Sequence, residues 1–525
     1  MIASSLADGW RVRHCAGMHT KLAQFSIAAL GTIFLMGYVS GASELGRISH
    51  QSNAQSSSRT RIRISAPSLV SHAASAPGLP TSGICFTPLL SPTGQFVLFS
   101  CQATDVIGGE PGIGDLIQND AVTNVNTGAG LDTDGQWGYC QGAELGTCGA
   151  AGIAVDAIGR QVVFNSGAPL TPDAVQLIPN AGTPYVFLRN EAAATTTLLT
   201  PPPQNESSPA YMEGKDASLE RSEVLFSSVF NLSGDADGNG LASDLYVRNW
   251  ISDSVELISV APDGAQGDAD TGFGVFSPDG RYVAFLSFAA NLTNDNPQHF
   301  PNLFLRDRYL STTRRLTFPG SGGDFPIPPF FSGQLRITAD NHYLLFGASG
   351  VSFTTGDDPS LLNLYLLDLI SGAVEQLPRT VDRLRPDASV SGDISDDATR
   401  LVFVSAATNV TADSVPGVFV QDLSSNEVVG ATASLGPLAR PPGTSLPRAR
   451  ISSDGSALAF EWPTFNAMFP TLLENQQIYR VAIRSATTSD AEAIPAMSRL
   501  AGIACALLIL GLASNALRGS RRERP

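Results

Sequence analysis

The stretch FSPDGRYVAF, residues 276–285, decides the fold, because six other parts of the chain repeat its pattern. In each copy a short apolar run closes on a phenylalanine. The seven phenylalanines are Phe99, Phe164, Phe226, Phe285, Phe346, Phe403 and Phe460. The steps between them are 65, 62, 59, 61, 57 and 57 residues. Self-similarity at a nearly fixed period indicates a repeat architecture, in which each unit packs against its neighbours.

Each repeat contains further apolar segments. NLFLRD (302–307) follows Phe285, TTRRLT (312–317) follows that segment, and another apolar segment precedes the turn SPDG (277–280). Proline pre-sets φ in such a turn and glycine accepts the positive φ that ends it. Four short strands per unit predict an all-β fold, a seven-bladed β-propeller of four-stranded antiparallel blades. An array of separate β-sandwiches is the alternative, but units of about 60 residues are short for such domains.

The two ends of the repeat region complement each other. The last unit reaches IYRVAIRS (478–485) and has no recognisable outer segment after it, whereas RTRIRIS (59–65) precedes the first unit and is similar to TTRRLT. We expect residues 59–65 to complete the last blade, because a strand there would pair an otherwise open sheet edge. The propeller is therefore predicted to span residues 59–485.

FSPDGRYVAFLSFAANL (276–292) and NLFLRDRYLSTTRRLT (302–317) resemble the repeats of the TolB-like, or PD40, family of WD40-like β-propellers. The resemblance covers residues from about 59 to 485 and is strongest in the fourth blade. It implies the propeller fold. It implies little about function, because the family includes receptors, scaffolds and accessory domains of peptidases. The segment before the first strand is too short for the separate N-terminal domain of TolB, so a role in the Tol–Pal system is not expected.

Residues 1–42 have the pattern of a secretory signal peptide. Basic residues precede an apolar stretch from Phe25 to Val39, and the small residues at 40–42 supply a cleavage site. An uncleaved membrane anchor is the alternative. Residues 43–58 are polar and are predicted to form a disordered linker.

The C-terminal region has the pattern of a sorting signal. A tether with a sorting motif, residues 486–498, contains Ile494 and Pro495, and residues 499–525 are predicted to form a transmembrane helix (500–517) and a basic cytoplasmic tail. This arrangement resembles the IPTL-CTERM relatives of PEP-CTERM signals, although residues 496–497 depart from the usual Thr-Leu. An ordinary C-terminal anchor is the alternative.

Both ends favour export. Basic residues at the membrane stay on the cytoplasmic side, so the propeller is expected outside the cytoplasm. We expect a periplasmic or cell-surface protein, anchored to or processed from the inner membrane of a Gram-negative bacterium. The formal net charge of −16 repels nucleic acid and anionic headgroups, and no nucleic-acid partner is expected.

Four cysteines lie in the predicted propeller. Cys85 and Cys101 flank the turn SPTG (91–94), which places them on facing strands of the first blade, and Cys140 and Cys148 close a glycine-rich loop. Two disulfides are expected, as is usual for an exported domain. A zinc site is the alternative, although CxxC spacing and nearby histidines are missing.

One loop has the pattern of a cation site. Asp235, Asp237 and Asn239 alternate ahead of Asp244, with a glycine after Asp237. This matches the opening of a calcium loop, in which oxygen ligands converge on one hard cation. The glutamate expected at position twelve is absent, because Tyr246 stands there. We predict possible calcium ligands at these four positions, with a polar turn as the alternative.

Recognisable catalytic machinery is missing from the sequence. His299 and His342 accompany no nucleophile motif, and no GxSxG elbow occurs. We therefore expect no enzyme and no certain cofactor, but a binding or scaffold module for a protein or glycan of the cell envelope. An extracellular polysaccharide-acting enzyme and a purely structural surface protein are the alternatives. Exposed docking residues are predicted at Phe325, Phe330 and Phe331.

Overall fold

The computed structural model describes residues 61–107, 115–137, 149–177, 185–200, 212–232, 238–295, 299–317, 329–380, 385–411, 415–435, 446–464 and 475–486. The chain divides into the units Met1–Ser57 and Ser58–Pro525, and all described residues belong to the second. The predicted signal (1–42), the sorting motif with Ile494 and Pro495, and the predicted membrane helix (500–517) lie outside the described residues. Among the described residues, no helix is long and apolar enough to cross a membrane.

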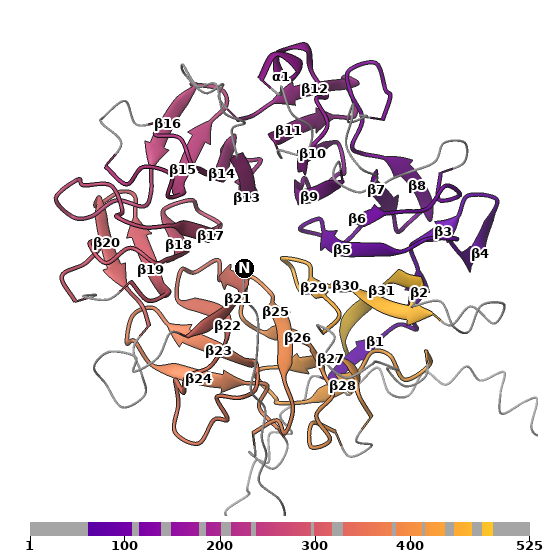
Figure 1. The fold of residues 1–525 in the computed structure, drawn as a ribbon. Helices are drawn as coiled ribbons and strands as arrows, with labels where there is room; N and C mark the ends of the chain where they lie inside the picture. Colours follow the sequence, from indigo (N-terminus) through magenta and orange to yellow (C-terminus); the bar gives the residue numbers. More distant parts are fainter. Residues whose placement is uncertain are drawn as a thin grey trace, which may run out of the picture. The chain divides into compact units, whose positions relative to one another are not determined.

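Seven four-stranded antiparallel sheets follow one another around a common centre, as Figure 1 shows. Blade 1 consists of β5 (Cys85–Leu90), β6 (Phe96–Cys101), β7 (Asp115–Asp120) and β8 (Val125–Gly128). Blade 2 consists of β9 (Ala150–Val155), β10 (Gln161–Ser166), β11 (Tyr185–Asn190) and β12 (Thr195–Leu198). Blade 3 consists of β13 (Met212–Ser218), β14 (Glu223–Ser228), β15 (Asp244–Asn249) and β16 (Ser254–Leu257).

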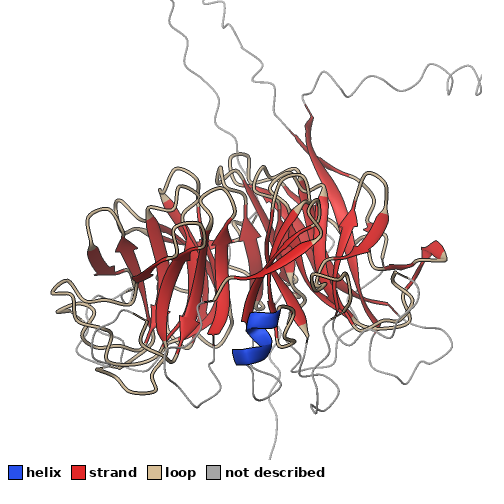
Figure 2. Cartoon of the chain, turned by 90° about the horizontal axis from the view of Figure 1, so that it is seen from above, coloured by secondary structure: helices blue, strands red, loops and turns tan. Residues whose placement is uncertain are grey.

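Blade 4 consists of β17 (Thr271–Phe276), β18 (Tyr282–Ser287), β19 (Asn302–Asp307) and β20 (Thr312–Arg315). Blade 5 consists of β21 (Phe330–Ile337), β22 (Tyr343–Ser349), β23 (Asn363–Asp368) and β24 (Val374–Leu377). Blade 6 consists of β25 (Val390–Ile394), β26 (Arg400–Ser405), β27 (Gly417–Asp422) and β28 (Val428–Gly430). The strands run between two loop-covered faces, and the short helix α1 (Pro172–Leu177) lies at one of them (Figure 2). The seven-bladed propeller predicted from the repeats is confirmed.

Blade 7 joins the two ends of the repeat region. β29 (Ala449–Ile451), β30 (Ala457–Thr464) and β31 (Asn475–Ala486) are completed by β1 (Arg61–Ile64), which pairs antiparallel with the end of β31. Arg61 faces Ala486 and Ile64 faces Ile483. The expected closure by the N-terminal strand is therefore confirmed.

The segment after β1 also pairs with blade 7. β2 (Ser68–Leu69) pairs with β31, and β3 (His72–Ala73) pairs with β4 (Ala76–Pro80) before blade 1 begins. The sequence does not predict the β3–β4 pair, because this hairpin matches no part of the repeat.

The repeated phenylalanine is the centre of each blade. All seven have at most 1% of their surface exposed, and each lies on the second strand of its blade. In six blades its cross-strand partner on the third strand is aromatic, as in Phe403 opposite Phe419, whose ring centroids are 5.1 Å apart. In blade 1 the partner of Phe99 is Ile117. Such pairs stabilise a sheet because opposite side chains share one face.

Close packing between blades requires glycine on the first strand of several blades, opposite the phenylalanine. Gly214 faces Phe226 and Gly274 faces Phe285. A Cβ on Gly274 would lie only 2.9 Å from Leu245 Cδ2, a side chain of the preceding blade. Because glycine has no side chain, a side chain of the preceding blade can pack directly against its backbone.

The predicted turns between the first and second strands have the hydrogen bonds and the positive glycine φ that are typical of such turns. In SPDG the Ser277 hydroxyl donates to Asp279 Oδ1 at 2.6 Å, accepts from the amide of Tyr282 at 2.9 Å, and Gly280 has φ of +69°. The turns of blades 5, 6, 7 and 1 are also bonded to one another. The amides of Ala339, Asp396 and Asp454 donate to the carbonyls of Asp396, Ser453 and Pro92.

One predicted docking residue is corrected by the structure. Phe331 is 6% exposed and packs against Phe346 and Phe353 in the core, whereas Phe330 is 64% exposed. Neighbouring residues of a strand point to opposite faces, so the two phenylalanines cannot both be exposed. Phe325 lies outside the described residues.

Blades 3 and 4 are joined by a cluster of charges whose central pair, Arg308 and Glu223, is largely buried. The guanidinium of Arg308 donates to both carboxylate oxygens of Glu223 at 3.0 Å and to Glu256 at 2.9 Å, while Arg221 contacts Glu223 at 2.9 Å. Burial alone would raise the pKa of Glu223, but hydrogen bonds from Arg308 and Arg221 outweigh it and lower that pKa.

Replacing Phe403 tests the central aromatic contact. We expect Phe403→Ala to lower the free energy of unfolding by about 4 kcal/mol, because a fully buried ring is replaced by a cavity. The exposed Phe330→Ala should change it by less than about 0.5 kcal/mol. Denaturant titrations of the two variants measure the difference, and equal effects would contradict the packing described above.

Replacing Glu223 tests the charge cluster. We expect Glu223→Gln to destabilise the protein by about 3 kcal/mol at pH 7, because it leaves Arg308 partly uncompensated in a buried site. A carboxylate whose pKa is lowered by folding stabilises above its unfolded pKa and loses this effect as the pH falls through its folded pKa. The difference from the wild type should therefore shrink below the ordinary glutamate pKa of 4.5.

Glu375→Gln is the matched control for this prediction. Glu375 pairs with Arg379 at the surface and its side chain is 47% exposed, so its loss should cost less than about 1 kcal/mol. Thermal unfolding as a function of pH compares the variants. A Glu223→Gln effect that persists unchanged in acid would rule out the ionic explanation.

Candidate functional site

A cavity of about 380 Å³ lies where the innermost strands of all seven blades converge. Residues of β5, β9, β13, β17, β21, β25 and β29 line it, so every repeat contributes to one site. Pockets of this size hold small ligands, with a few placed polar groups that give specificity. The lining here carries four basic and three acidic side chains: Lys215, Arg336, Arg448, Arg450, Glu213, Asp216 and Asp393.

Irregular strands direct side chains into this cavity. The innermost strand is out of register with the second strand in blades 1 to 5, while blades 6 and 7 pair without a shift. The extra residues include Ile153, Lys215, Phe273, Ser332 and Gln334, and all five line the cavity. A β-bulge re-aims a side chain at a local cost in pairing, and bulges gather next to functional sites.

Two of these bulged residues contact each other across blades 3 and 4. The ammonium of Lys215 lies 2.7 Å from Glu213 Oε2 and 5.5 Å from the ring centroid of Phe273. Phe273 is 47% exposed although it lies on the innermost strand. Lys215 thus has an acidic partner and an aromatic partner, and much of the ring of Phe273 still faces solvent.

Four of the charged residues occupy one position of the repeat. Asp216, Arg336, Asp393 and Arg450 each stand ten residues before the blade's central phenylalanine, where blades 1, 2 and 4 have Leu89, Ala154 and Val275. Each faces the residue just before that phenylalanine on the second strand. These seven equivalent positions form one level of the ring, the ring level, which is apolar in three blades and charged in four.

The two aspartates at this level make equivalent bonds. Asp216 accepts hydrogen bonds from the amide of Ala217 and, at 2.8 Å, from the amide of Phe276 in the next blade. Asp393 accepts from Ile394 and, at 3.2 Å, from Ile451 in the next blade. Burial raises the pKa of Asp216 to about 6, although these amide bonds oppose the rise. Asp216 therefore changes charge near neutral pH.

Arg336 occupies the same position in blade 5 and is held by the turns of the next two blades. Its guanidinium donates to Asp396 Oδ1 at 2.6 Å and to the Ser453 hydroxyl at 3.1 Å. Burial disfavours its charge, but attraction to Asp393, Asp396 and Asp216 outweighs this and raises the pKa of Arg336. Arg336 therefore stays cationic and links blades 5, 6 and 7.

The arginines of blade 7 differ from Arg336. The backbone of Arg448 is fixed by the buried Glu461, whose carboxylate accepts the amides of Arg448 and Thr87 at 2.9 and 2.8 Å. The side chains of Arg448 and Arg450 make no hydrogen bond or ion pair with any residue that the structure describes. Arg448 is exposed and Arg450 is half-buried at the cavity wall.

Of the four predicted calcium residues, Asn239 and Asp244 are described, and neither is among the residues that line this cavity. Asp235 and Asp237 lie outside the described residues. Asn239 and Asp244 are brought together, but their oxygens already accept hydrogen bonds from protein groups. Asp244 accepts from Ser259 at 2.7 Å, from Asn239 at 3.1 Å and from Gln266, and Asn239 Oδ1 accepts from Gln266 at 3.3 Å. Within the described chain no three His, Cys, Asp or Glu side chains gather as metal ligands. Calcium binding stays a prediction.

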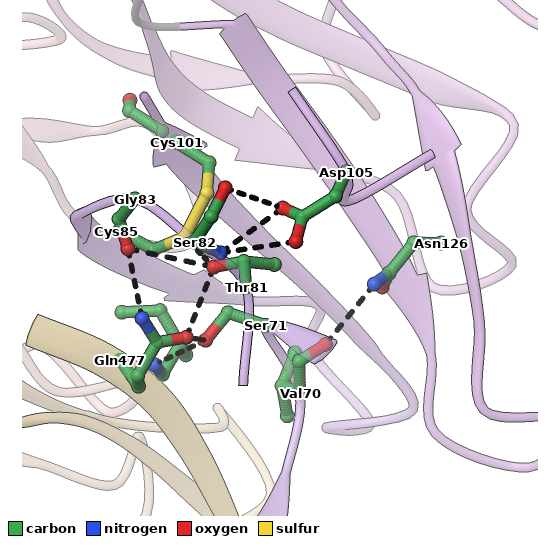
Figure 3. The surroundings of a disulfide bond; sticks show 12 residues. Val70, Ser71, Thr81, Ser82, Gly83, Cys85, Cys101, Asp105, Asn126 and Gln477 are labelled. Carbon is green, nitrogen blue, oxygen red and sulfur yellow. Dashed lines mark hydrogen bonds between the residues drawn. A yellow bond between two sulfur atoms is a disulfide. The ribbon is translucent and has the colours of Figure 1, made fainter. Parts of the chain in front are cut away.

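The first predicted cysteine pair is joined by a disulfide. Cys85 faces Cys101 on β5 and β6, and Figure 3 shows the bond between them. Beside it, Gln477 of β31 accepts hydrogen bonds from Ser71 at 2.7 Å and Thr81 at 3.1 Å. The disulfide thus lies where the N-terminal segment, blade 1 and blade 7 meet. Cys140 and Cys148 lie outside the described residues.

The three histidines that the structure describes, His72, His299 and His342, are not among the residues that line the cavity. The imidazole of His299 is 61% exposed, and His342 stacks on Tyr343 with ring centroids 4.3 Å apart. A third, His72, is 3% exposed and its Nε2 lies 3.0 Å from the carbonyl of Asn124. No motif in the sequence marks His72, because it lies in the β3–β4 hairpin outside the repeat.

Together these features define a class of protein, a seven-bladed β-propeller with a polar cavity at its centre. No protein-family model matches the sequence, and no curated protein matches it. Among solved structures, the chain is similar to an oligogalacturonate lyase from Vibrio parahaemolyticus, with 11% identity, a TM-score of 0.48, and coverage of 81% of this chain and 97% of the lyase.

Two other similar structures differ in kind. TolB from Acinetobacter baumannii is 13% identical, with a TM-score of 0.36 and coverage of 78% of this chain and 81% of TolB. A post-proline cleaving enzyme from Rickettsia typhi is 10% identical, with a TM-score of 0.41 and coverage of 73% of this chain and 49% of the enzyme.

The calcium prediction is tested by titrating the full chain with Ca²⁺ in calorimetry. The motif predicts one site that Asp237→Asn abolishes and that Asp134→Asn, in the weaker repeat of the motif at residues 132–135, leaves intact. Loss of one carboxylate removes a ligand from a site built of oxygen donors. Absence of binding heat in the wild type would leave a polar turn as the explanation of the motif.

Proposed function

We propose that this protein is an exported, envelope-associated propeller that acts as a non-enzymatic binding or scaffold module, with the central cavity as its binding site. The observation that carries the proposal is the set of bulges on the innermost strands. They give up regular pairing and place Lys215, Phe273 and Gln334 into one cavity. Side chains that only stabilised the ring would not need this irregularity.

The bonding of the cavity carboxylates favours binding over catalysis. Asp216 and Asp393 each accept two backbone amides, and Glu213 pairs with Lys215. A general base needs a lone pair free to reach the substrate's proton. These bonds use part of the acceptor capacity of each carboxylate to stabilise the inner ring, and recognition falls mainly to Arg448, Arg450 and the exposed ring of Phe273.

Export is part of the proposal. It rests on the predicted signal in residues 1–42, on the sorting motif with Ile494 and Pro495, and on the predicted membrane helix at 500–517. The Cys85–Cys101 disulfide supports it, because such bonds persist in oxidising compartments. The partners proposed are an envelope protein or glycan at the cavity and processing machinery at the C-terminus.

A second candidate function is supported by one observation. A carboxyl group with a pKa of about 6 is suited to proton transfer near neutral pH, and Asp216 has such a pKa at the wall of a polar cavity. An enzyme acting on extracellular polysaccharide is therefore the alternative. Turnover of envelope or extracellular polysaccharides by the full chain, abolished in Asp216→Ala, would establish it and overturn the binding module.

Capture experiments with the immobilised full chain test the binding module. Phe273→Asp places a charge beside Lys215 in the cavity, and Phe330→Ala changes an exposed ring at the start of β21. We expect a specific envelope protein or glycan to be retained by the wild type and by Phe330→Ala, and at least tenfold less by Phe273→Asp. Retention lost in Phe330→Ala alone would place the partner on the loops instead.

A further inference from the structure

Arg448 and Arg450 present two guanidinium groups to one site. They stand at i and i+2 around Ala449 of β29, so they lie on the same side of the strand. Both line the cavity, and neither side chain has a hydrogen-bonding or ionic partner within the described chain. A half-buried charge without a partner is unfavourable, and guanidinium forks match the geometry of a carboxylate.

The acidic groups of the cavity do not act as ionic partners of Arg448 and Arg450. Asp216 and Asp393 are engaged by backbone amides, and Glu213 is engaged by Lys215. Outside the lining, Asp396 is engaged by Arg336 at 2.6 Å. An anionic ligand would therefore supply the counter-charge that the half-buried Arg450 lacks, with the exposed Arg448 beside it.

The remaining lining restricts what that ligand is. Phe273 offers an exposed ring face. Gln334, Ser332 and Ser453 also line the cavity, bonded to Ser391 at 2.8 Å, to the carbonyl of Gly347 at 3.3 Å and to Arg336 at 3.1 Å, and each amide or hydroxyl group has capacity for a further hydrogen bond. Polar groups on several sides suit a ligand with hydroxyls, and a volume of about 380 Å³ suits one ring or a short chain. The net charge of −16 disfavours a long polyanion at the surface but affects a single carboxylate little.

We propose that the cavity binds a small hydroxylated carboxylic acid, of the size of an acidic monosaccharide, whose carboxylate is held between Arg448 and Arg450. This inference rests on the proposed function of the cavity as a binding site and names the chemistry of its ligand. The ring or chain of the ligand lies against Phe273, and its hydroxyls bond to the amide and hydroxyl groups of the lining.

Calorimetric titration of the full chain with sodium glucuronate tests the proposal. Glucose is the matched neutral probe, and inorganic phosphate is the probe for anion binding of any kind. We expect glucuronate to bind, and glucose and phosphate to bind at least tenfold more weakly. Equal binding of glucose or of phosphate, or no binding of glucuronate, overturns the proposal.

Three variants assign the binding to these residues. Arg448→Gln and Arg450→Gln should each weaken glucuronate binding at least tenfold, and Arg450→Lys should weaken it less, because the charge stays while the fork is lost. Arg63→Gln, at an exposed position of β1, removes the same charge elsewhere and should have no effect. Thermal unfolding confirms that each variant is folded, and unchanged affinity in folded Arg450→Gln overturns the proposal.

The two proposals fail separately. If glucuronate does not bind while envelope capture still depends on Phe273, the cavity remains a binding site and only the nature of the ligand is wrong. If capture does not depend on Phe273 while glucuronate binds through Arg450, the cavity takes a small ligand and is not the site at which the envelope partner binds.

Discussion

The contact between the second and third strands of each blade is the constraint on which the rest of the propeller depends. A phenylalanine such as Phe285 lies against an aromatic partner such as Phe304, with ring centroids 5.7 Å apart and both side chains fully buried. This contact fixes the register of the two middle strands, because a slip of one residue would turn the ring on the slipped strand to the other face of the sheet. The first strand is then positioned by a tight turn, and glycines such as Gly274 let the preceding blade fill the space beside it.

Because the middle strands carry the packing, the innermost strand is free to deviate. Five of the seven innermost strands shift register, and in blades 2 to 5 extra residues reach the cavity. Phe273 shows the consequence most plainly, since a large apolar side chain is 47% exposed at the centre of the ring. In each blade the two middle strands are therefore rigid, and the innermost strand is the one that varies. This arrangement keeps the site in place while the residues that line it differ from blade to blade.

The fold could be predicted from the sequence because every blade repeats the same buried phenylalanine and the same turn, from SPTG to SSDG. The closure by β1 could be predicted for the same reason, since residues 59–65 resemble an outer strand. The cavity could not be found in this way, because its residues are those that depart from the repeat. Asp216 and Arg336 stand where other blades have Ala154 or Val275, and only their common distance from the phenylalanine marks them. The sequence predicts an exposed Phe331 because the proline- and glycine-rich residues 319–333 have the composition of a loop, whereas β21 begins at Phe330.

The charged ring level also explains why Arg450 is available to a ligand. Three of its four charged residues bond to the next blade, Asp216 to the amide of Phe276, Arg336 to Asp396, and Asp393 to the amide of Ile451. At the junction of blades 7 and 1 that task falls to another residue, because Glu461 of β30 accepts the amide of Thr87 in blade 1. Arg450 occupies the same ring level without holding two blades together. Its charge therefore contributes to the cavity and not to the ring, which is the condition under which a half-buried guanidinium favours an anion from outside.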